Sequence, residues 1–147
     1  MTMSPEGEIS GTIAAGAFAG SPYVVSVVVF DRAAGGQDPL SDSTTFTWTI
    51  SDNTPPLFVG NVVASAPATA TDTTMNLSWP VATDTGSGLF EYRVTGGPAP
   101  LMFPAGTNAA LITGLSPSTP YTFQVVAVDN AGNVSPALTS NTLSTTP

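Results

Sequence analysis

The chain has 147 residues, a formal net charge of −8 and 8% charged residues. Its only basic side chains are Arg32 and Arg93, and it contains no Lys, His or Cys. This composition excludes nucleic-acid binding through a basic surface, attraction to an anionic membrane, disulfides, thiolate metal sites and the usual general bases of enzymes. No apolar run reaches the roughly 20 residues of a membrane helix. We therefore expect neither a nucleic-acid partner nor membrane insertion.

The first 54 residues are predicted to form three β-strands, at 7–13, 23–30 and 45–50. In the third of these, apolar and polar residues alternate, which is typical of a strand with one face on a core, whereas the second is an apolar run of strand length interrupted by Ser26. Tyr23 and Trp48 fall at inward positions of these two strands. We therefore expect both side chains in a hydrophobic core.

A break in the chain is predicted at the paired prolines Pro55 and Pro56. Proline cannot donate a ladder hydrogen bond, and its ring fixes φ. This pattern indicates a β module at 1–54, a proline-rich linker at 55–57 and a second domain at 58–147. A further turn is predicted at 33–39, where Gly, Asp and Pro cluster.

The region after the linker favours seven short strands separated by turns. In the second strand Met75, Leu77 and Trp79 share one face, and in the third Phe90 and Tyr92 do so. This alternation predicts an all-β fold, an immunoglobulin-like antiparallel β-sandwich preceded by a partial module of the same kind. The seven expected strands are 59–66, 74–79, 89–95, 100–103, 109–113, 121–129 and 138–145.

Three stretches of this second region carry a family resemblance. "LSW" at 77–79, "YRV" at 92–94 and "GLSPSTPYTFQVVAVDNAGNVS" at 114–135 resemble a fibronectin type III domain. The resemblance covers about 56–147. It implies a sandwich of two antiparallel sheets.

The L-x-P-x-T-x-Y pattern that ends at Tyr121 is the most specific part of this resemblance. In the family this is the tyrosine corner, where the phenol bonds to nearby backbone. Trp79 stands where the family keeps a core Trp. The resemblance therefore implies five structural core residues: Trp79, Tyr92, Leu115, Pro117 and Tyr121.

The first region resembles the last part of the cadherin-like or putative-Ig modules of bacterial surface proteins. The resemblance rests on "GEISGTI" at 7–13, followed by the strands at 23–30 and 45–50. Three strands cannot close a sandwich, because one sheet face would lack its opposing layer. Three outcomes stay open: an excised segment without stable structure, packing onto the second domain, or completion by strands from another copy.

Few residues offer chemistry. Asp84 and Glu91 are a possible carboxylate pair of the kind that glycosidases use. Asp84, however, lies in the turn predicted at 84–88, and Glu91 lies on an outward strand position. We therefore interpret both as solvated surface acids, and the chain as having no catalytic residues.

Calcium is a possible cofactor at two stretches. Asp52 and Asn53 stand at the boundary, and Asp129, Asn130 and Asn133 cluster in a turn. Calcium takes 6–8 oxygen ligands, usually with several carboxylates, whereas each stretch offers one. The alternative is that Asp and Asn are present because they build turns.

Two groups of apolar residues are candidates for binding. Phe58, Phe90 and Phe103 could form an aromatic platform for a glycan. Leu101, Met102 and Phe103 could form a small exposed contact patch close to a loop.

These observations favour a non-enzymatic, extracellular structural or adhesive segment of a bacterial surface or secreted multidomain protein. It would act as a spacer or a protein-interaction module, with neighbouring domains of the same polypeptide as partners. One alternative is a filament subunit that is completed by strand exchange between copies. The other is a carbohydrate-binding accessory module.

Overall fold

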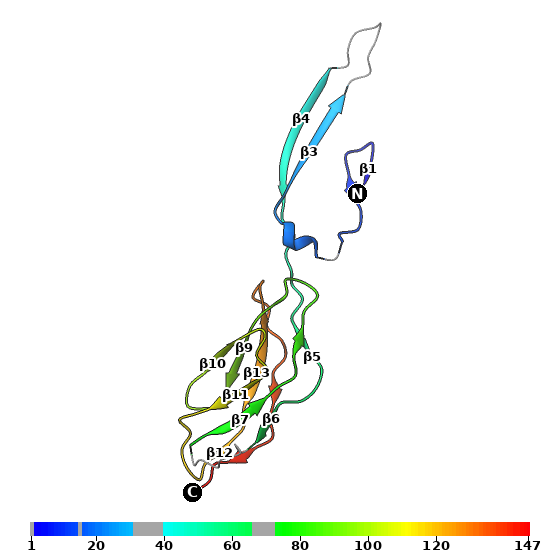
Figure 1. The fold of residues 1–147 in the computed structure, drawn as a ribbon. Helices are drawn as coiled ribbons and strands as arrows, with labels where there is room; N and C mark the ends of the chain where they lie inside the picture. The colour runs from blue at the N-terminus through cyan, green and yellow to red at the C-terminus, as the bar shows by residue number, and fades with distance from the viewer. Residues whose placement is uncertain (1, 15, 31–39, 66–72) are drawn as a thin grey trace. The chain divides into compact units, whose positions relative to one another are not determined.

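The computed structural model describes residues 2–14, 16–30, 40–65 and 73–147 (Figure 1). The chain divides into two compact units, Met1–Asp52 and Asn53–Pro147. The predicted linker at 55–57 therefore lies inside the second unit, where Pro56 is fully buried. Arg32 and the turn predicted at 33–39 lie outside the described residues.

The first unit contains two separate antiparallel strand pairs. β1 pairs with β2, and the longer β3 pairs with β4 along its whole length, from Tyr23 opposite Trp48 to Phe30 opposite Ser41. The strand predicted at 7–13 is therefore shorter than expected and does not join this hairpin. The elements are β1 (Thr2–Met3), β2 (Ile9–Ser10), the short helix η1 (Ala17–Gly20), β3 (Tyr23–Phe30) and β4 (Ser41–Trp48).

None of the described residues of the first unit is buried. Tyr23 is 39% exposed and Trp48 is half-buried, so the prediction that both lie in a core is wrong. Alternation and β-branched residues suffice to pair β3 with β4. Burial requires a second layer over the sheet, and the described part of this unit provides none.

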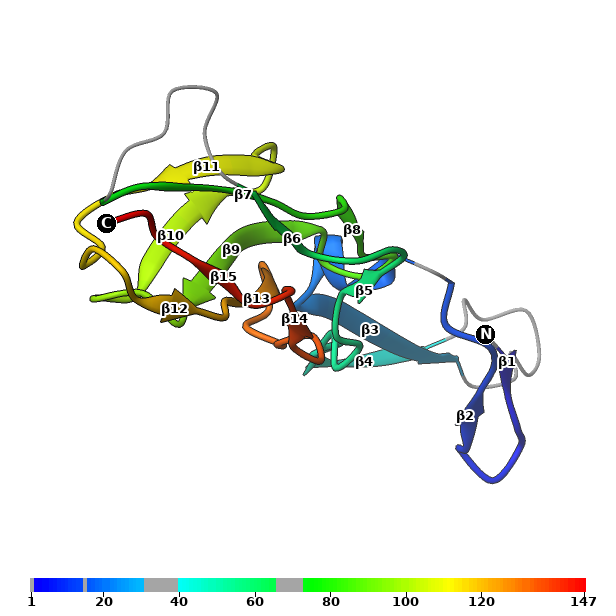
Figure 2. The ribbon, with the colours of Figure 1, turned by 90° about the horizontal axis from the view of Figure 1, so that it is seen from below.

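The second unit is a sandwich of antiparallel strands (Figure 2). One sheet has the order β10-β9-β13-β14 and the other has the order β11-β7-β6, while β5-β8 and β12-β15 form two small additional pairs. The strands are β5 (Leu57–Phe58), β6 (Val63–Ser65), β7 (Met75–Ser78), β8 (Ala82–Thr83), β9 (Leu89–Thr95), β10 (Leu101–Pro104), β11 (Ala109–Ile112), β12 (Pro120–Tyr121), β13 (Gln124–Asp129), β14 (Leu138–Thr139) and β15 (Leu143–Ser144). The all-β fold class is confirmed.

The core lies between these two sheets and follows the alternation of the sequence. On β7, Met75 and Leu77 are buried while Ser78 is exposed. Trp79 follows this strand, and its ring centroid lies 5.7 Å from that of Tyr92 on the facing sheet. The buried apolar side chains of the cluster are Val62, Ala64, Met75, Leu77, Trp79, Ala82, Tyr92, Val94, Ile112, Leu115, Phe123, Val125 and Ala127.

Two predicted strands are interrupted. The strand expected at 121–129 breaks between β12 and β13, where Phe123 exchanges hydrogen bonds with Ser140. The strand expected at 138–145 breaks at the same place, into β14 and β15. The first predicted strand, 59–66, is reduced to β6 among the described residues, and β8 was not predicted.

The side chain of Phe90 does not face inward, as the alternation predicted for β9 required. Its side chain is 56% exposed, although Phe90 and Tyr92 were expected on the same inward face. The register between β13 and β9 shifts at this point, because Val128 pairs with Glu91 and Asp129 pairs with Leu89. This β-bulge leaves Phe90 without a partner on β13 and reverses its direction.

No helix of the described residues is long and apolar enough to cross a membrane.

Candidate functional site

The loop before β12 has the geometry of a tyrosine corner. The backbone N–H of Ser116 donates a 2.9 Å hydrogen bond to the hydroxyl of Tyr121, whose ring stacks on Phe123. Leu115 is buried beneath the loop, whereas Pro117 is exposed, so Pro117 is not a core residue as predicted. It lies at the tip of the turn, where its carbonyl accepts a hydrogen bond from the Thr119 hydroxyl.

We expect Tyr121→Phe to lower the free energy of unfolding by about 1 kcal/mol, measured by urea denaturation, because one hydrogen bond at a half-exposed site is lost. The ring and its contact with Phe123 remain. A loss above about 3 kcal/mol would contradict this geometry, because that range corresponds to truncation of buried apolar groups.

The predicted contact patch does not form a common exposed surface. Leu101 and Phe103 pack against the core, and only Met102, which is 68% exposed, faces outward. The reason is the period of a strand, since successive residues of β10 point to opposite faces.

The three Phe side chains of the predicted aromatic platform likewise do not form one exposed surface. Phe58 lies 5.9 Å from Tyr92 and Phe103 lies 5.4 Å from Trp79 between ring centroids, so both cover the core. Phe90 is the one member of this group with a mostly exposed side chain.

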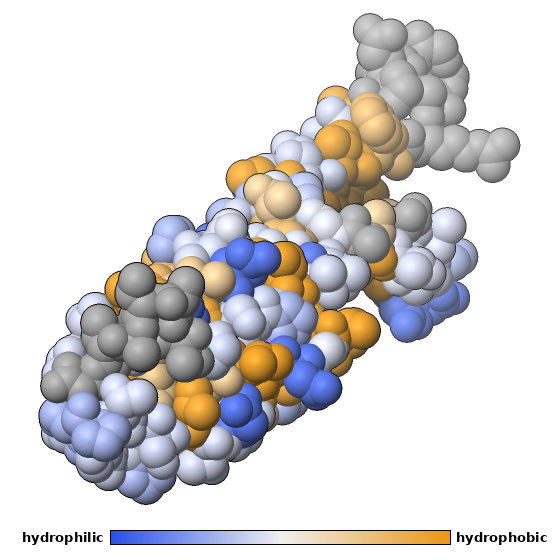
Figure 3. Space-filling view, turned by 60° about the horizontal axis from the view of Figure 1, so that its bottom comes forward, coloured by the Kyte–Doolittle hydropathy of each residue, from blue (hydrophilic) through white to orange (hydrophobic). Residues whose placement is uncertain are grey.

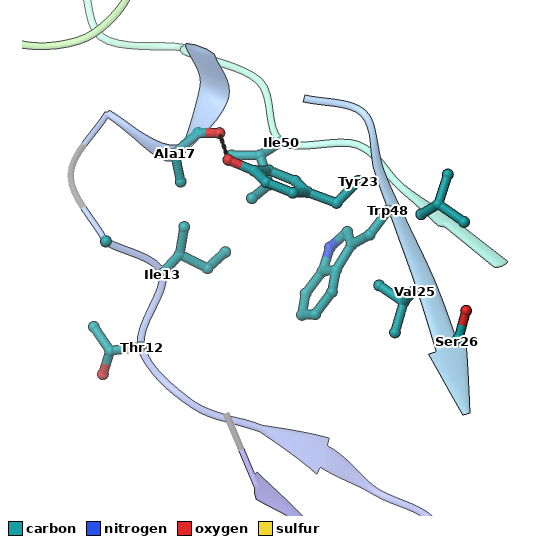
Figure 4. A pocket seen from close by; sticks show the side chains of 10 residues that line it. Thr12, Ile13, Ala17, Tyr23, Val25, Ser26, Trp48 and Ile50 are labelled. Atoms are coloured by element: carbon teal, nitrogen blue, oxygen red, sulfur yellow. Dashed lines mark hydrogen bonds between the residues drawn. The ribbon is translucent and has the colours of Figure 1, made fainter. Parts of the chain in front are cut away.

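The first unit exposes hydrophobic residues along its β3–β4 hairpin (Figure 3). A cavity of about 410 Å³ lies between this hairpin and residues 12–14 and Ala17, and Figure 4 shows Ile13, Tyr23 and Trp48 around it. Its lining is mainly apolar, and the Tyr23 hydroxyl donates a hydrogen bond to the carbonyl of Ala17. Such a surface suits an apolar side chain or an added strand better than a charged ligand.

Two turns of the second unit are held together by hydrogen bonds. The side-chain amide of Asn130 donates to the carbonyls of Ser87 and Gly88, each at 2.9 Å. The backbone N–H of Ala131 donates to the Ser87 hydroxyl at 3.0 Å. The turn at 84–88 and the turn at 129–133 therefore form one connected loop region.

This loop region brings two carboxylates together. The carboxylate oxygens of Asp84 and Asp129 lie within 4.8 Å of each other. Glu91, which was considered and set aside as a catalytic partner of Asp84, forms a 2.7 Å ion pair with Arg93. The pairing of Asp84 with Asp129 was missed because each residue was assigned to a separate turn.

The boundary between the two units divides the first predicted calcium stretch, whereas the second stretch lies wholly in the second unit. Asp52 is the last residue of the first unit and is half-buried. Asn53 is exposed and begins the second unit, which also contains the turn at 129–133.

The comparison with known families agrees with this architecture. The fibronectin type III domain family matches residues 59–142, which is more than half of the chain. The chain belongs to the fibronectin type III family. The matched residues contain both sheets of the sandwich, the tyrosine corner and the connected loop region.

Relatives of this fibronectin type III chain include chitinases and an endoglucanase. Chitinase Chi52 of Paenibacillus xylanexedens is 38% identical over 114 residues, which are 78% of this chain and 19% of the chitinase. Endoglucanase B of Cellulomonas fimi is 38% identical over 122 residues, which are 79% of this chain and 11% of that protein. Among solved structures, chitinase ChiA74 from Bacillus thuringiensis has a TM-score of 0.56 and 33% identity, over 67% of this chain and 14% of its own. The chain thus spans between 11% and 19% of the length of these relatives.

Proposed function

We propose that the chain is a non-enzymatic spacer segment of a secreted, multidomain enzyme that degrades an insoluble polysaccharide such as chitin or cellulose. The observation that carries the proposal is a 38% identity to a chitinase over 78% of this chain but only 19% of the chitinase. A segment of that kind accompanies a catalytic domain. The chain has no His, Cys or Lys, so a nucleophile activated by one of these bases is not available.

The second unit has the geometry that a spacer requires. Its strands enclose one continuous core, which makes the sandwich resistant to bending. In Figure 1 the chain enters the sandwich at one end and leaves it, at the C-terminus, at the other. Domains attached at these two points would be held apart by the length of the sandwich.

The first unit would be the last part of an Ig-like or cadherin-like module in the same polypeptide. The match to Endoglucanase B covers 79% of this chain and, because the second unit begins at Asn53, it extends into the first unit. The relatives thus share sequence with this chain beyond the fibronectin type III domain. This supports a row of β modules as the setting of the segment.

The test of the spacer function is a comparison of activity and binding on chitin and cellulose. We expect the full chain to release no soluble sugar and to stay in the supernatant after sedimentation of the polymer. Retention with the polymer would favour the carbohydrate-binding alternative, and Phe90→Ala would then be expected to abolish it, because Phe90 is the exposed aromatic. Release of sugar would overturn the proposal.

Strand exchange between copies is the second candidate, and the exposed hairpin favours it. Val24 and Phe30 are 75% and 68% exposed, although β3 is a low-charge strand of the kind that pairs readily. Sedimentation velocity at several concentrations separates the two functions. A spacer stays monomeric, whereas a filament grows with concentration, and Val24→Lys would prevent that growth.

A further inference from the structure

The carboxylate of Asp129 is fixed inside the loop region that joins the turns at 84–88 and 129–133. Asp129 is 1% exposed. Its Oδ1 accepts hydrogen bonds from the backbone N–H groups of Ala131 at 2.9 Å and Asn133 at 2.7 Å, and its Oδ2 accepts one from the Asn133 side-chain amide at 2.8 Å. These three hydrogen bonds fix the orientation of the carboxylate.

The carboxylate of Asp84 is satisfied on one side only. Its Oδ2 accepts a 2.7 Å hydrogen bond from the backbone N–H of Gly88. Its Oδ1 is buried and has no hydrogen-bond partner among the described residues. A buried carboxylate oxygen without a donor or a cation is costly, since it has lost water and gained nothing in exchange.

The close approach of the two acids adds a second cost. Their oxygens lie within 4.8 Å of each other, and two like charges at that distance repel. Arg93, the basic side chain that the structure describes, is already paired with Glu91 at 2.7 Å. The described part of the chain therefore offers no side chain that neutralises this pair.

We propose that Asp84 and Asp129 bind a Ca²⁺ ion between the turns at 84–88 and 129–133. The unpartnered Oδ1 of Asp84 supplies a ligand that nothing else uses, and Asp129 supplies the second charge. Ca²⁺ takes oxygen ligands in a flexible geometry and completes its shell with backbone carbonyls and water, whereas Zn²⁺ prefers the His and Cys that this chain lacks. With two carboxylates, the affinity belongs to the range of extracellular modules, a Kd of about 0.1–1 mM.

Bound Ca²⁺ would tie together two turns that leave neighbouring strands. The turn at 84–88 precedes β9, and the turn at 129–133 follows β13, which pairs with β9. A ligand that binds only the folded state raises the melting temperature in proportion to the logarithm of its concentration. The ion would thus stiffen one end of the spacer wherever extracellular calcium reaches millimolar levels.

The experiment is a titration of the EDTA-treated full chain with CaCl₂ at constant ionic strength, followed by calorimetry and thermal melting. We expect saturable binding, and a rise in melting temperature of about 6–11 °C at ten times Kd. MgCl₂ at the same concentrations should produce a much smaller shift, because Mg²⁺ demands a near-ideal octahedral shell. Equal shifts with both ions would overturn the site and indicate general charge screening.

Asp84→Asn is the deciding variant. It keeps the shape and the Gly88 contact but removes the charge, so Ca²⁺ affinity should fall at least about tenfold. Without calcium the variant should melt at the same temperature as the wild type or higher, because the repulsion is relieved. If Asp84 only stabilised the turn at 84–88, the variant would instead melt at a lower temperature than the wild type without calcium. Asp42→Asn, at an exposed position on β4, is the matched control and should bind Ca²⁺ as the wild type does. Unchanged affinity in Asp84→Asn overturns the proposal.

Discussion

Replacing Tyr92 by alanine is expected to lower the free energy of unfolding of the second unit by about 3–5 kcal/mol, measured by urea denaturation. The side chain is fully buried, with its ring centroid 5.9 Å from that of Phe58 and 5.7 Å from that of Trp79. Alanine would leave a cavity between the sheets. It would also remove the acceptor of the 2.9 Å hydrogen bond from the backbone N–H of Ala82. Since small domains have a total stability of about 5–15 kcal/mol, the variant would be marginally folded.

Two further variants separate the contributions at this position. Tyr92→Phe keeps the ring packing and removes only the hydroxyl, so we expect a loss of about 1–2 kcal/mol. Phe90→Ala, on the same strand but at a 56% exposed position, should change the stability by less than about 0.5 kcal/mol. Equal losses for Phe90→Ala and Tyr92→Ala would contradict the bulge in β9.

The fold was predictable from the sequence where alternation and burial agree. Met75, Leu77 and Trp79 alternate with polar residues, and all three are buried in the structure. The tyrosine corner was predictable from its spacing, because the pattern that ends at Tyr121 specifies a local hydrogen bond rather than a distant contact. Local patterns thus identified the fibronectin type III family, which residues 59–142 match.

The predictions of burial were wrong where the burial of a residue depends on structure outside its own strand. Phe90 has the inward phase, but a register shift against β13 turns it to solvent. Tyr23 and Trp48 lie at predicted inward positions of their strands, yet no second layer covers their hairpin among the described residues. Met102, with Leu101 and Phe103, was grouped by sequence proximity, whereas strand period separates its side chain from theirs.

The proximity of Asp84 and Asp129 could have been predicted from the sequence together with the family's strand order. Neither turn carries two carboxylates, so each looks too poor in charge for calcium. The strand order of a fibronectin type III sandwich, however, places β9 beside β13 in antiparallel orientation. The turn before one strand must then lie next to the turn after the other, and the two acids could have been paired from topology alone.

Gly96→Ala is the second substitution with a large expected effect, about 3 kcal/mol or more in urea denaturation. Gly96 has φ +100°, which is unfavourable for any residue with a Cβ. An added Cβ would also overlap the backbone carbonyl oxygen of Thr122 and lie 3.0 Å from the Cα of Phe123. Backbone cannot move aside as the end of a flexible side chain can, so the end of β9 would have to separate from the 122–123 segment.

Two matched glycines divide this cost into its parts. Gly132 also has a positive φ, +91°, but a Cβ there would meet nothing within 4 Å, so Gly132→Ala should cost only the conformational term of about 1–2 kcal/mol. Gly106→Ala has neither problem and should be nearly neutral. The excess of Gly96→Ala over Gly132→Ala then measures the backbone approach itself. That approach lies where the predicted 121–129 strand breaks, so a negligible excess would mean that the break does not depend on the close contact with Gly96.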